Sequence, residues 1–226
     1  MADYCFYIVG VGGTGSLLAR DLPQLLLSVR GQDHSMCLID GDTVERKNMI
    51  RQRFQSHDVG YNKAIALARK INSIYPVECT VIDQYLTDKE LLCAIEKDHR
   101  IPVIIGCVDN DATRRLLEKT FRQIETGVYI DSANSAYSGN VFSVIKSKGV
   151  YYGKTRGQAK QLGTKDKNPA EMSCIERSAA GELQYFITNA KQAVCILEHC
   201  FCLITEGEPK ITGVTKLDRF AEVHFG

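Results

Sequence analysis

The segment that most constrains the fold is an apolar run that breaks into four closely spaced glycines and then resumes. Residues 4–9 read YCFYIV, residues 10–15 read GVGGTG, and SLLAR follows. This order predicts a β-strand, a tight turn and a helix. The first N–H groups of a helix have no intrahelical partner, and the helix dipole favours an anion beside them. We therefore expect a cradle for a nucleotide phosphate, and its glycines are Gly10, Gly12, Gly13 and Gly15.

An acidic residue at the end of the next apolar run supports this expectation. Residues 36–39 read MCLI and lead directly into Asp40. A carboxylate that follows the second strand of such a unit can accept hydrogen bonds from the hydroxyl groups of a ribose. The alternative is a tight strand-to-helix turn in an α/β protein that binds nothing there.

Strand-like and helix-like patterns alternate through the first half of the chain. Besides residues 4–9, the expected strands are residues 36–39, 78–82, 102–107 and 128–131, and the expected helices are residues 15–28, 63–74, 88–97 and 111–124. Alternation at this spacing predicts an α/β fold with a Rossmann-like, doubly wound and mainly parallel sheet. Ligands bind such sheets beyond the carboxyl ends of the strands, where the glycine turn, Asp40 and Asp109 fall.

The pattern changes in the second half of the chain. The expected elements there are a strand at residues 140–145, a long apolar C-terminal helix at 178–204, and antiparallel edge strands at 211–214 and 220–225. Residues from about 146 to 173 are rich in Lys, Gly and Gln and lack periodicity, which predicts a mobile, solvated crossover loop. We expect residues 1–226 to form a single domain, because a chain of this length with 44% hydrophobic residues can build one sizeable core.

The charge balance and the cysteine pattern argue against several classes of protein. The 28 basic and 27 acidic residues give a net charge of +1, so neither nucleic acid nor an anionic membrane is an expected partner. No apolar run reaches the roughly 18 residues of a membrane span, and no signal peptide is expected. Nine cysteines occur without the close pairing of a secreted scaffold. These features predict a cytoplasmic protein with reduced thiols.

More charged and polar residues surround the expected nucleotide site than a simple NAD site needs. They are Asp40, Asp42, Asn48, Arg51, Gln52, Lys63, Asp109, Asn110 and Arg114. Arginine and lysine neutralise transferring phosphates, and an aspartate at a strand end can hold a magnesium ion that bridges them. The set therefore favours a nucleoside triphosphate over NAD.

Taken together, these motifs resemble the ThiF/MoeB/HesA family, the core of ubiquitin-activating enzymes. The chain carries GVGGTG, then LIDGDTVERKNMIRQ, then Lys63, then CVDN followed by Arg114, in the order that the family has them. The similarity continues through YIDSANSAYSGNVFSV and resumes at Ser173. The second of these motifs is long and specific, so a chance match of the combination is not expected.

The resemblance implies ATP and magnesium as cofactors and gives each residue a role. Asp40 would bind the ribose of ATP, and Asp109 would bind magnesium. Asn110 and Arg114 would support the loop that carries Asp109. Asp42 would either contact the nucleotide or form a structural ion pair with Arg114. The residues expected around the phosphates are Gly10, Gly12, Gly13, Gly15, Asn48, Arg51, Lys63 and, behind the direct contacts, Gln52.

The reaction that the resemblance implies is adenylation. A carboxylate, usually the C-terminal glycine of a small ubiquitin-like or sulfur-carrier protein, attacks the α-phosphate of ATP and releases pyrophosphate. A carboxylate is already ionised at neutral pH, so no general base is needed. Catalysis then depends on positioning and on neutralising phosphate charge with Arg51, Lys63 and magnesium. The resemblance also implies a homodimer, and the long apolar helix is a candidate contact.

Two departures from the family pattern concern metal binding and the start of the chain. The two C-x-x-C pairs that hold a structural zinc in many relatives are absent from the sequence, so no zinc is expected. Many relatives also carry an arginine on a helix before the first strand, and here it is expected to be missing or to come from elsewhere.

One cysteine has a setting that suits reactivity. Cys174 lies in MSCIERS, shortly before an expected helix, and the N-terminus of a helix favours a thiolate. The residue would either accept the activated acyl group after adenylation or be a buried structural cysteine.

Other functions remain open at this point. The chain could be a nucleotide-binding but non-catalytic subunit of a heterodimer. It could also adenylate a small-molecule or RNA-borne carboxylate, although the near-zero net charge argues against RNA.

Overall fold

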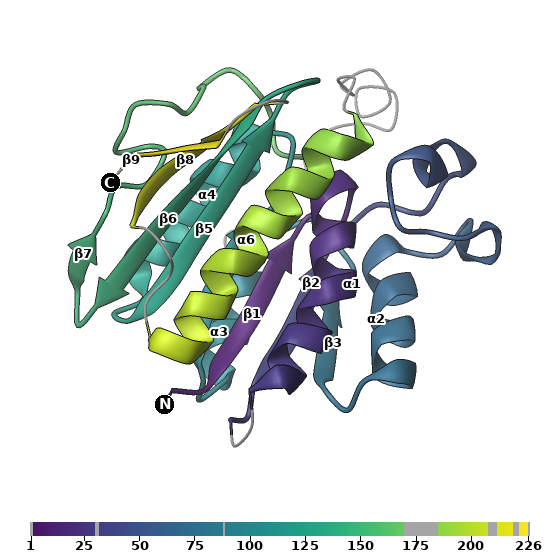
Figure 1. Ribbon diagram of the computed structural model, residues 1–226, viewed down its shortest axis with the longest axis horizontal. Helices are drawn as coiled ribbons and strands as arrows, with labels where there is room; N and C mark the ends of the chain where they lie inside the picture. The colour runs from purple at the N-terminus through teal and green to yellow at the C-terminus, as the bar shows by residue number, and fades with distance from the viewer. Residues whose placement is uncertain are drawn as a thin grey trace.

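The backbone forms one nine-stranded mixed sheet with helices on both faces (Figure 1). The structure is a computed structural model that describes residues 2–29, 32–87, 89–169, 185–207, 212–218 and 222–225. The strands are β1 (Tyr4–Val9), β2 (Ser35–Ile39), β3 (Glu78–Ile82), β4 (Ile101–Gly106), β5 (Gly127–Asn134), β6 (Gly139–Ser147), β7 (Val150–Tyr152), β8 (Gly213–Leu217) and β9 (Glu222–Phe225). The helices are α1 (Gly13–Ser28), α2 (Lys63–Ile74), α3 (Glu90–Lys97), α4 (Asp111–Gln123) and α6 (Phe186–Glu206), with short 3-10 helices η1 (Arg46–Ile50) and η2 (Ser56–Asp58).

The strand order explains why the first strand is completely buried. The order is β3-β2-β1-β4-β5-β6-β8-β9, with β7 paired to β6. Strands β1 to β5 run parallel, and β6 to β9 add to them in antiparallel fashion. All six residues of β1 are buried, as expected for a strand with neighbours on both edges and helices on both faces.

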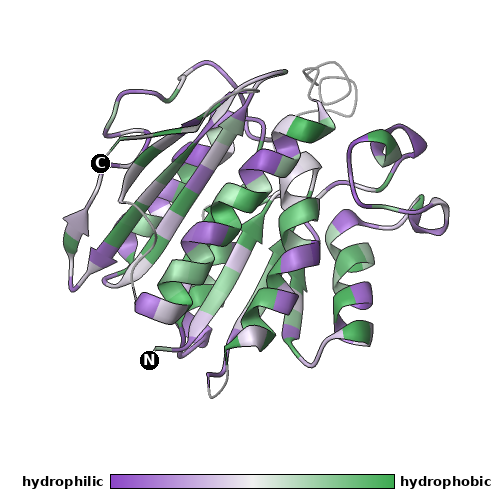
Figure 2. Ribbon diagram, viewed as in Figure 1, coloured by the Kyte–Doolittle hydropathy of each residue, from purple (hydrophilic) through white to green (hydrophobic). Residues whose placement is uncertain are grey.

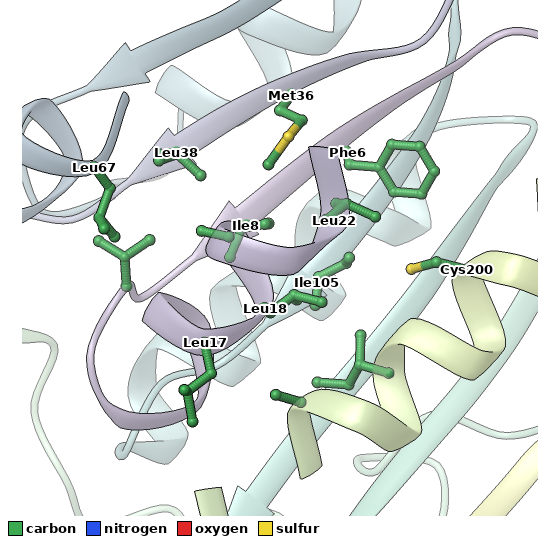
Figure 3. Close-up of a cluster of buried hydrophobic side chains, with 14 of the residues drawn as sticks. Phe6, Ile8, Leu17, Leu18, Leu22, Met36, Leu38, Leu67, Ile105 and Cys200 are labelled. Atoms are coloured by element: carbon green, nitrogen blue, oxygen red, sulfur yellow. The ribbon is translucent and has the colours of Figure 1, made fainter. Parts of the chain in front are cut away.

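Alternate side chains of the central strands build two separate cores. Phe6 and Ile8 belong to the core that β1 shares with α1, α2 and α6, whereas Tyr7 and Val9 belong to the core shared with α3 and α4. Figure 3 shows Leu18 and Leu22 of α1 close to Ile8 and Phe6 in the first of these cores. The central strands are coloured mainly green to white, and the helices in front of them carry both apolar and polar residues (Figure 2). Burial of both faces accounts for the unbroken apolar runs of these strands.

The predicted fold class is confirmed by this architecture, and several elements lie where the sequence placed them. Helix α2 and strand β3 have the expected bounds, while α1 begins two residues earlier than expected, at Gly13. Strand β5 is longer than expected and reaches Asn134. No helix among the described residues is long and apolar enough to cross a membrane.

The start of the expected crossover loop is the main difference in secondary structure. Residues 146–152 complete β6 and form β7 instead of continuing as a loop. The turn between the two strands consists of Lys148 (φ +48°) and Gly149 (φ +81°), and two successive positive φ angles are what a tight hairpin turn needs. Lysine rarely adopts a positive φ, so the sequence did not indicate this hairpin. The mobility of the remaining loop stays a prediction.

The turn between β1 and α1 is tight at Gly10 and Gly15, where the backbone leaves no room for a side chain. Gly10 has a φ of +84°, and its N–H donates to the carbonyl of Ile39 over 2.8 Å. A Cβ atom on Gly15 would lie 1.9 Å from the carbonyl oxygen of Gly10. Because that oxygen belongs to the backbone of the same turn, it cannot move without displacing the turn.

We expect Gly15→Ala to lower the free energy of unfolding by about 1–3 kcal/mol, the range for overpacked sites. Alanine is the better helix former, so any net loss measures the clash with the Gly10 carbonyl. Urea unfolding would measure it, with Glu96→Ala on the exposed side of α3 as the control. Equal stability of Gly15→Ala and the wild-type protein would contradict this account of the turn.

Candidate functional site

The predicted site residues lie beyond the carboxyl ends of three neighbouring strands. Strand β1 leads into the glycine turn, β2 leads into Asp40, and β4 leads into the loop that carries Asp109. Since β2, β1 and β4 are adjacent and parallel, these three segments meet at one edge of the sheet. This edge is where open α/β sheets bind their ligands.

Asp40 joins the two turns that form the middle of the site. Its Oδ2 accepts the N–H of Val11 over 2.8 Å, and its Oδ1 accepts the N–H of Asp42 over 2.8 Å. Burial raises the pKa of Asp40, while the positive charge of Lys63 opposes the rise. The hydroxyl groups of a ribose would give this half-buried carboxylate the further donors that favour its ionised form.

Lys63 is the buried cation of the site. It is the first residue of α2 and 6% exposed, and its Nζ lies 2.8 Å from Oδ2 of Asp42. The hydroxyl of Tyr85 donates to the other oxygen of Asp42. Burial by itself lowers the pKa of Lys63, but the neighbouring carboxylates of Asp40, Asp42 and Asp109 raise it above its usual value. The ammonium group is therefore held charged beside the glycine turn.

The loop after β2 carries three predicted site residues: Asn48 supports the loop, whereas Gln52 and Arg51 have polar groups available for a ligand. Oδ1 of Asn48 accepts the N–H of Glu45 over 2.8 Å, so this buried side chain braces η1. Gln52 lies beside the glycine turn, with its Nε2 3.7 Å from the place of a Cβ on Gly12. Its Oε1 is buried without a hydrogen-bond partner among the described residues. The guanidinium of Arg51 forms no ion pair or hydrogen bond with any residue that the structure describes, which leaves it available for an anion.

Asp109 is the most open carboxylate of the site. It is exposed, and within the described part of the chain the only polar contact of its side chain is with Nδ2 of Asn110, at 3.4 Å. Asn110 caps α4 by accepting the N–H of Thr113 over 2.8 Å. Asp109 thus has oxygens to offer a cation, while its neighbour fixes the start of the helix.

Arg114 fixes the loop of Asp109 by a hydrogen bond to its backbone. Its side chain is 8% exposed and lies 2.8 Å from Asp111 and 3.3 Å from Asp131. It also donates to the carbonyl of Val108, directly before Asp109. This is the geometry that a supporting role requires. The alternative of an ion pair between Asp42 and Arg114 is wrong, because Asp42 pairs with Lys63 and Arg114 pairs with Asp111 and Asp131.

The structure adds site residues that the sequence did not indicate. Asn189 of α6 packs against the glycine turn so closely that a Cβ on Gly13 would lie 2.3 Å from its Nδ2. Oδ1 of Asn189 accepts from Asn134, which ends β5, over 2.5 Å. No local pattern could have linked Asn189 to Gly13, since 176 positions separate them (189 − 13). Tyr85 was missed for the same reason, because its partner Asp42 lies on another strand connection.

The predicted reactive thiol, Cys174, lies outside the described residues. Within the described ranges, no cluster of three or more His, Cys, Asp or Glu side chains could hold a metal ion by itself. A magnesium ion that is bound mainly by phosphates uses only one or two carboxylates, and the open carboxylate of Asp109 fits that use.

The assembled site can bind a phosphorylated, ribose-containing anion. The glycine turn offers helix N–H groups, Lys63 and Arg51 offer positive charge, and Asp40 offers hydrogen-bond acceptors. These groups come from separate segments that meet at one sheet edge.

Comparison with known sequences places this arrangement in a family. A profile of the ThiF family matches residues 2–215. Ubiquitin-like modifier-activating enzyme 5 of Branchiostoma floridae is 30% identical over 159 residues, which cover 64% of this chain and 36% of that protein. The enzyme of the same name from Gallus gallus is 28% identical over 153 residues, which cover 61% and 36% of the two chains. The chain thus spans about a third of the length of these curated relatives.

Solved structures with the same fold include PaaA and, from E. coli, MccB. PaaA gives a TM-score of 0.65 at 18% identity and covers 97% of this chain and 62% of its own. MccB with ATP gives a TM-score of 0.64 at 16% identity and covers 96% and 60%. At these identities the likeness concerns the fold. With the family profile matching nearly its whole length, the chain belongs to the ThiF family.

Proposed function

We propose that this chain adenylates a carboxylate with ATP and magnesium. The observation that carries the proposal is the convergence of the glycine turn, Asp40, Lys63 and Asp109 on one edge of the sheet in a member of the ThiF family. ThiF-family relatives named ubiquitin-like modifier-activating enzymes, and an MccB structure that contains ATP, support the use of ATP. Residues 1–226 would act as a single adenylation domain.

The ligand-binding residues of the site would each bind a particular part of ATP or its magnesium ion. Asp40 would accept hydrogen bonds from the ribose, and the N–H groups at the start of α1 would hold the phosphates. Arg51 and Lys63 would neutralise the charge that develops on the phosphates as pyrophosphate leaves. Asp109 would hold magnesium, which would supply positive charge to neutralise the phosphates. Asn48, Gln52 and Asn110 would keep the surrounding loops in place.

The proposed substrate is the C-terminal carboxylate of a small ubiquitin-like or sulfur-carrier protein. The curated relatives are named for the activation of ubiquitin-like modifiers, which supports this class of partner. An ionised carboxylate can attack the α-phosphate without a base, so the site needs only to position the two reactants. The chain would act in the cytoplasm, where such carriers and ATP meet.

Asp109→Asn should lower the rate of carrier-dependent ATP–pyrophosphate exchange about 10²- to 10³-fold, as expected when a charge that stabilises the transition state is lost. Glu125→Gln removes the same charge from an exposed position beyond the far end of α4 and serves as the control. Equal exchange by Asp109→Asn and the wild-type protein would contradict the assigned magnesium role. ATP binding without exchange with any carrier would favour a non-catalytic subunit of a heterodimer.

We also propose that the chain forms a homodimer through α1 and α6. Between these helices lies a groove of about 880 Å³ that includes Leu25, Val194 and Phe201. Val194 and Phe201 are 55% and 48% exposed and lie two turns apart on the side of α6 that lines the groove, and an exposed apolar patch of this kind can mark a protein contact.

Light scattering at tens of micromolar should therefore give the mass of two chains. Phe201→Glu would place a charge in the proposed contact and should shift the protein to the monomer. Ile74→Glu is the matched control, because Ile74 is 68% exposed at the end of α2 and is not part of the groove. A monomeric wild-type protein would refute this interface.

Cys174 is proposed to act after adenylation, if the activated group is transferred to a thiol. Cys174→Ala should retain pyrophosphate exchange, since the attacking group in that step is a carboxylate, but should form no thiol-sensitive conjugate with the carrier. Cys93→Ala, at an exposed free cysteine, is the control and should form the conjugate normally. If the wild-type protein adenylates a carrier without forming such a conjugate, Cys174 has a structural role.

A further inference from the structure

Residues 153–169, here called the strap, follow β7 and are fixed to the outer side of α4. At the first end, Oγ1 of Thr155 and the N–H of Gly157 donate to the carboxylate of Glu118 over 2.8 and 2.7 Å. Arg156 is 4% exposed and pairs with Asp131, which is fully buried. This end is therefore held by a buried ion pair and by a buried carboxylate that accepts two hydrogen bonds.

The other end of the strap is held by Asp166. Oδ2 of Asp166 accepts the backbone N–H of Asp111 and that of Ala112, the latter over 3.1 Å. Its Oδ1 lies 3.1 Å from the guanidinium of Arg115, which also donates to the carbonyls of Gly163 and Asp166. The carboxylate thus binds the first turn of α4 and a side chain of the same helix.

Asp166 completes a helix cap that the local sequence leaves unfinished. The side chain of Asn110, the cap residue of α4, accepts the N–H of Thr113. The N–H groups of Asp111 and Ala112 have no intrahelical acceptor at this end, and Asp166 supplies one. A negative charge at this place also suits the helix dipole.

A short chain of contacts leads from this cap to Asp109. Asp111 accepts the N–H of Gly163 over 2.7 Å with Oδ2 and a hydrogen bond from Arg114 over 2.8 Å with Oδ1. Arg114 in turn donates to the carbonyl of Val108. The strap, the first turn of α4 and the loop of Asp109 therefore share one network of hydrogen bonds.

We propose that Asp166 is a positioning residue that, when the strap is docked, sets the carboxylate of Asp109 for magnesium. The inference rests on the proposed function, because the magnesium role of Asp109 belongs to it. Asp166 touches neither the glycine turn nor Lys63, and it acts through the α4 cap and Arg114. The site would therefore bind magnesium more tightly when the strap is docked against α4.

The experiment is a magnesium titration of carrier-dependent ATP–pyrophosphate exchange. In Asp166→Asn, the magnesium concentration for half-maximal exchange should rise about five- to tenfold, the range expected when a helix cap is lost. At saturating magnesium, the exchange rate and the KM for ATP should return close to the wild-type values. Glu125→Gln, which removes an exposed charge beyond the other end of α4, should leave the titration unchanged.

A second pair of variants keeps the test independent of a general loss of folding. Arg115→Lys keeps the positive charge but loses the fork that reaches Gly163 and Asp166, and it should shift the titration in the same direction. If the two residues act as one unit, the double variant Asp166→Asn/Arg115→Lys should raise the magnesium concentration for half-maximal exchange by less than the product of the two single fold-changes. Thermal unfolding of each variant measures any loss of stability alongside.

The possible outcomes separate this inference from the proposed function. Normal exchange by the wild-type protein with an unchanged titration in Asp166→Asn would overturn the inference alone. A loss of exchange in Asp166→Asn that saturating magnesium does not restore would show a structural role and also overturn it. No exchange by the wild-type protein with any carrier would overturn the proposed function and this inference together.

Discussion

The site depends first on the carboxylate of Asp40. Two backbone N–H groups, from Val11 and Asp42, converge on it, so one side chain sets the distance between the turns that follow β1 and β2. Burial raises its pKa, which means that the folded chain disfavours the charge that the turns require. Lys63 compensates by adding positive charge, and Lys63 is in turn held by Asp42, which also accepts a hydrogen bond from Tyr85. The polar centre is thus a set of mutually dependent charges, in which a bound nucleotide would complete the pairing.

A second set of paired charges surrounds Asp131, on the side of the sheet that α4 covers. It supports the loop of Asp109 through Arg114. Asp131 is fully buried between Arg114 and Arg156, which come from α4 and from the strap. Such a group is costly to bury, and removing one partner would leave an uncompensated charge in the interior. Its arrangement therefore specifies one docked position for the strap against α4.

The sequence predicted best what depends on short-range periodicity. The parallel strands and helix α2 follow from apolar patterns within a few residues, and the strand ends then bring the glycine turn, Asp40 and Asp109 together. It missed the hairpin at Lys148 because lysine rarely adopts a positive φ. It could not assign ion-pair partners, which is why Arg114 was considered for Asp42. Partners such as Asn189 and Asp166 come from segments far along the chain, and only the fold brings them to the site.

The contact between Gly13 and Asn189 joins two segments that lie far apart in the sequence, and it also affects how each position can change in evolution. A Cβ atom at position 13 would lie 2.3 Å from Nδ2 of Asn189, so a side chain there requires Asn189 to move or to be replaced by a smaller residue. Substitutions at the two positions are therefore coupled, and the glycine turn does not vary independently of α6. A helix near the end of the chain thus sets the evolutionary freedom of its first turn.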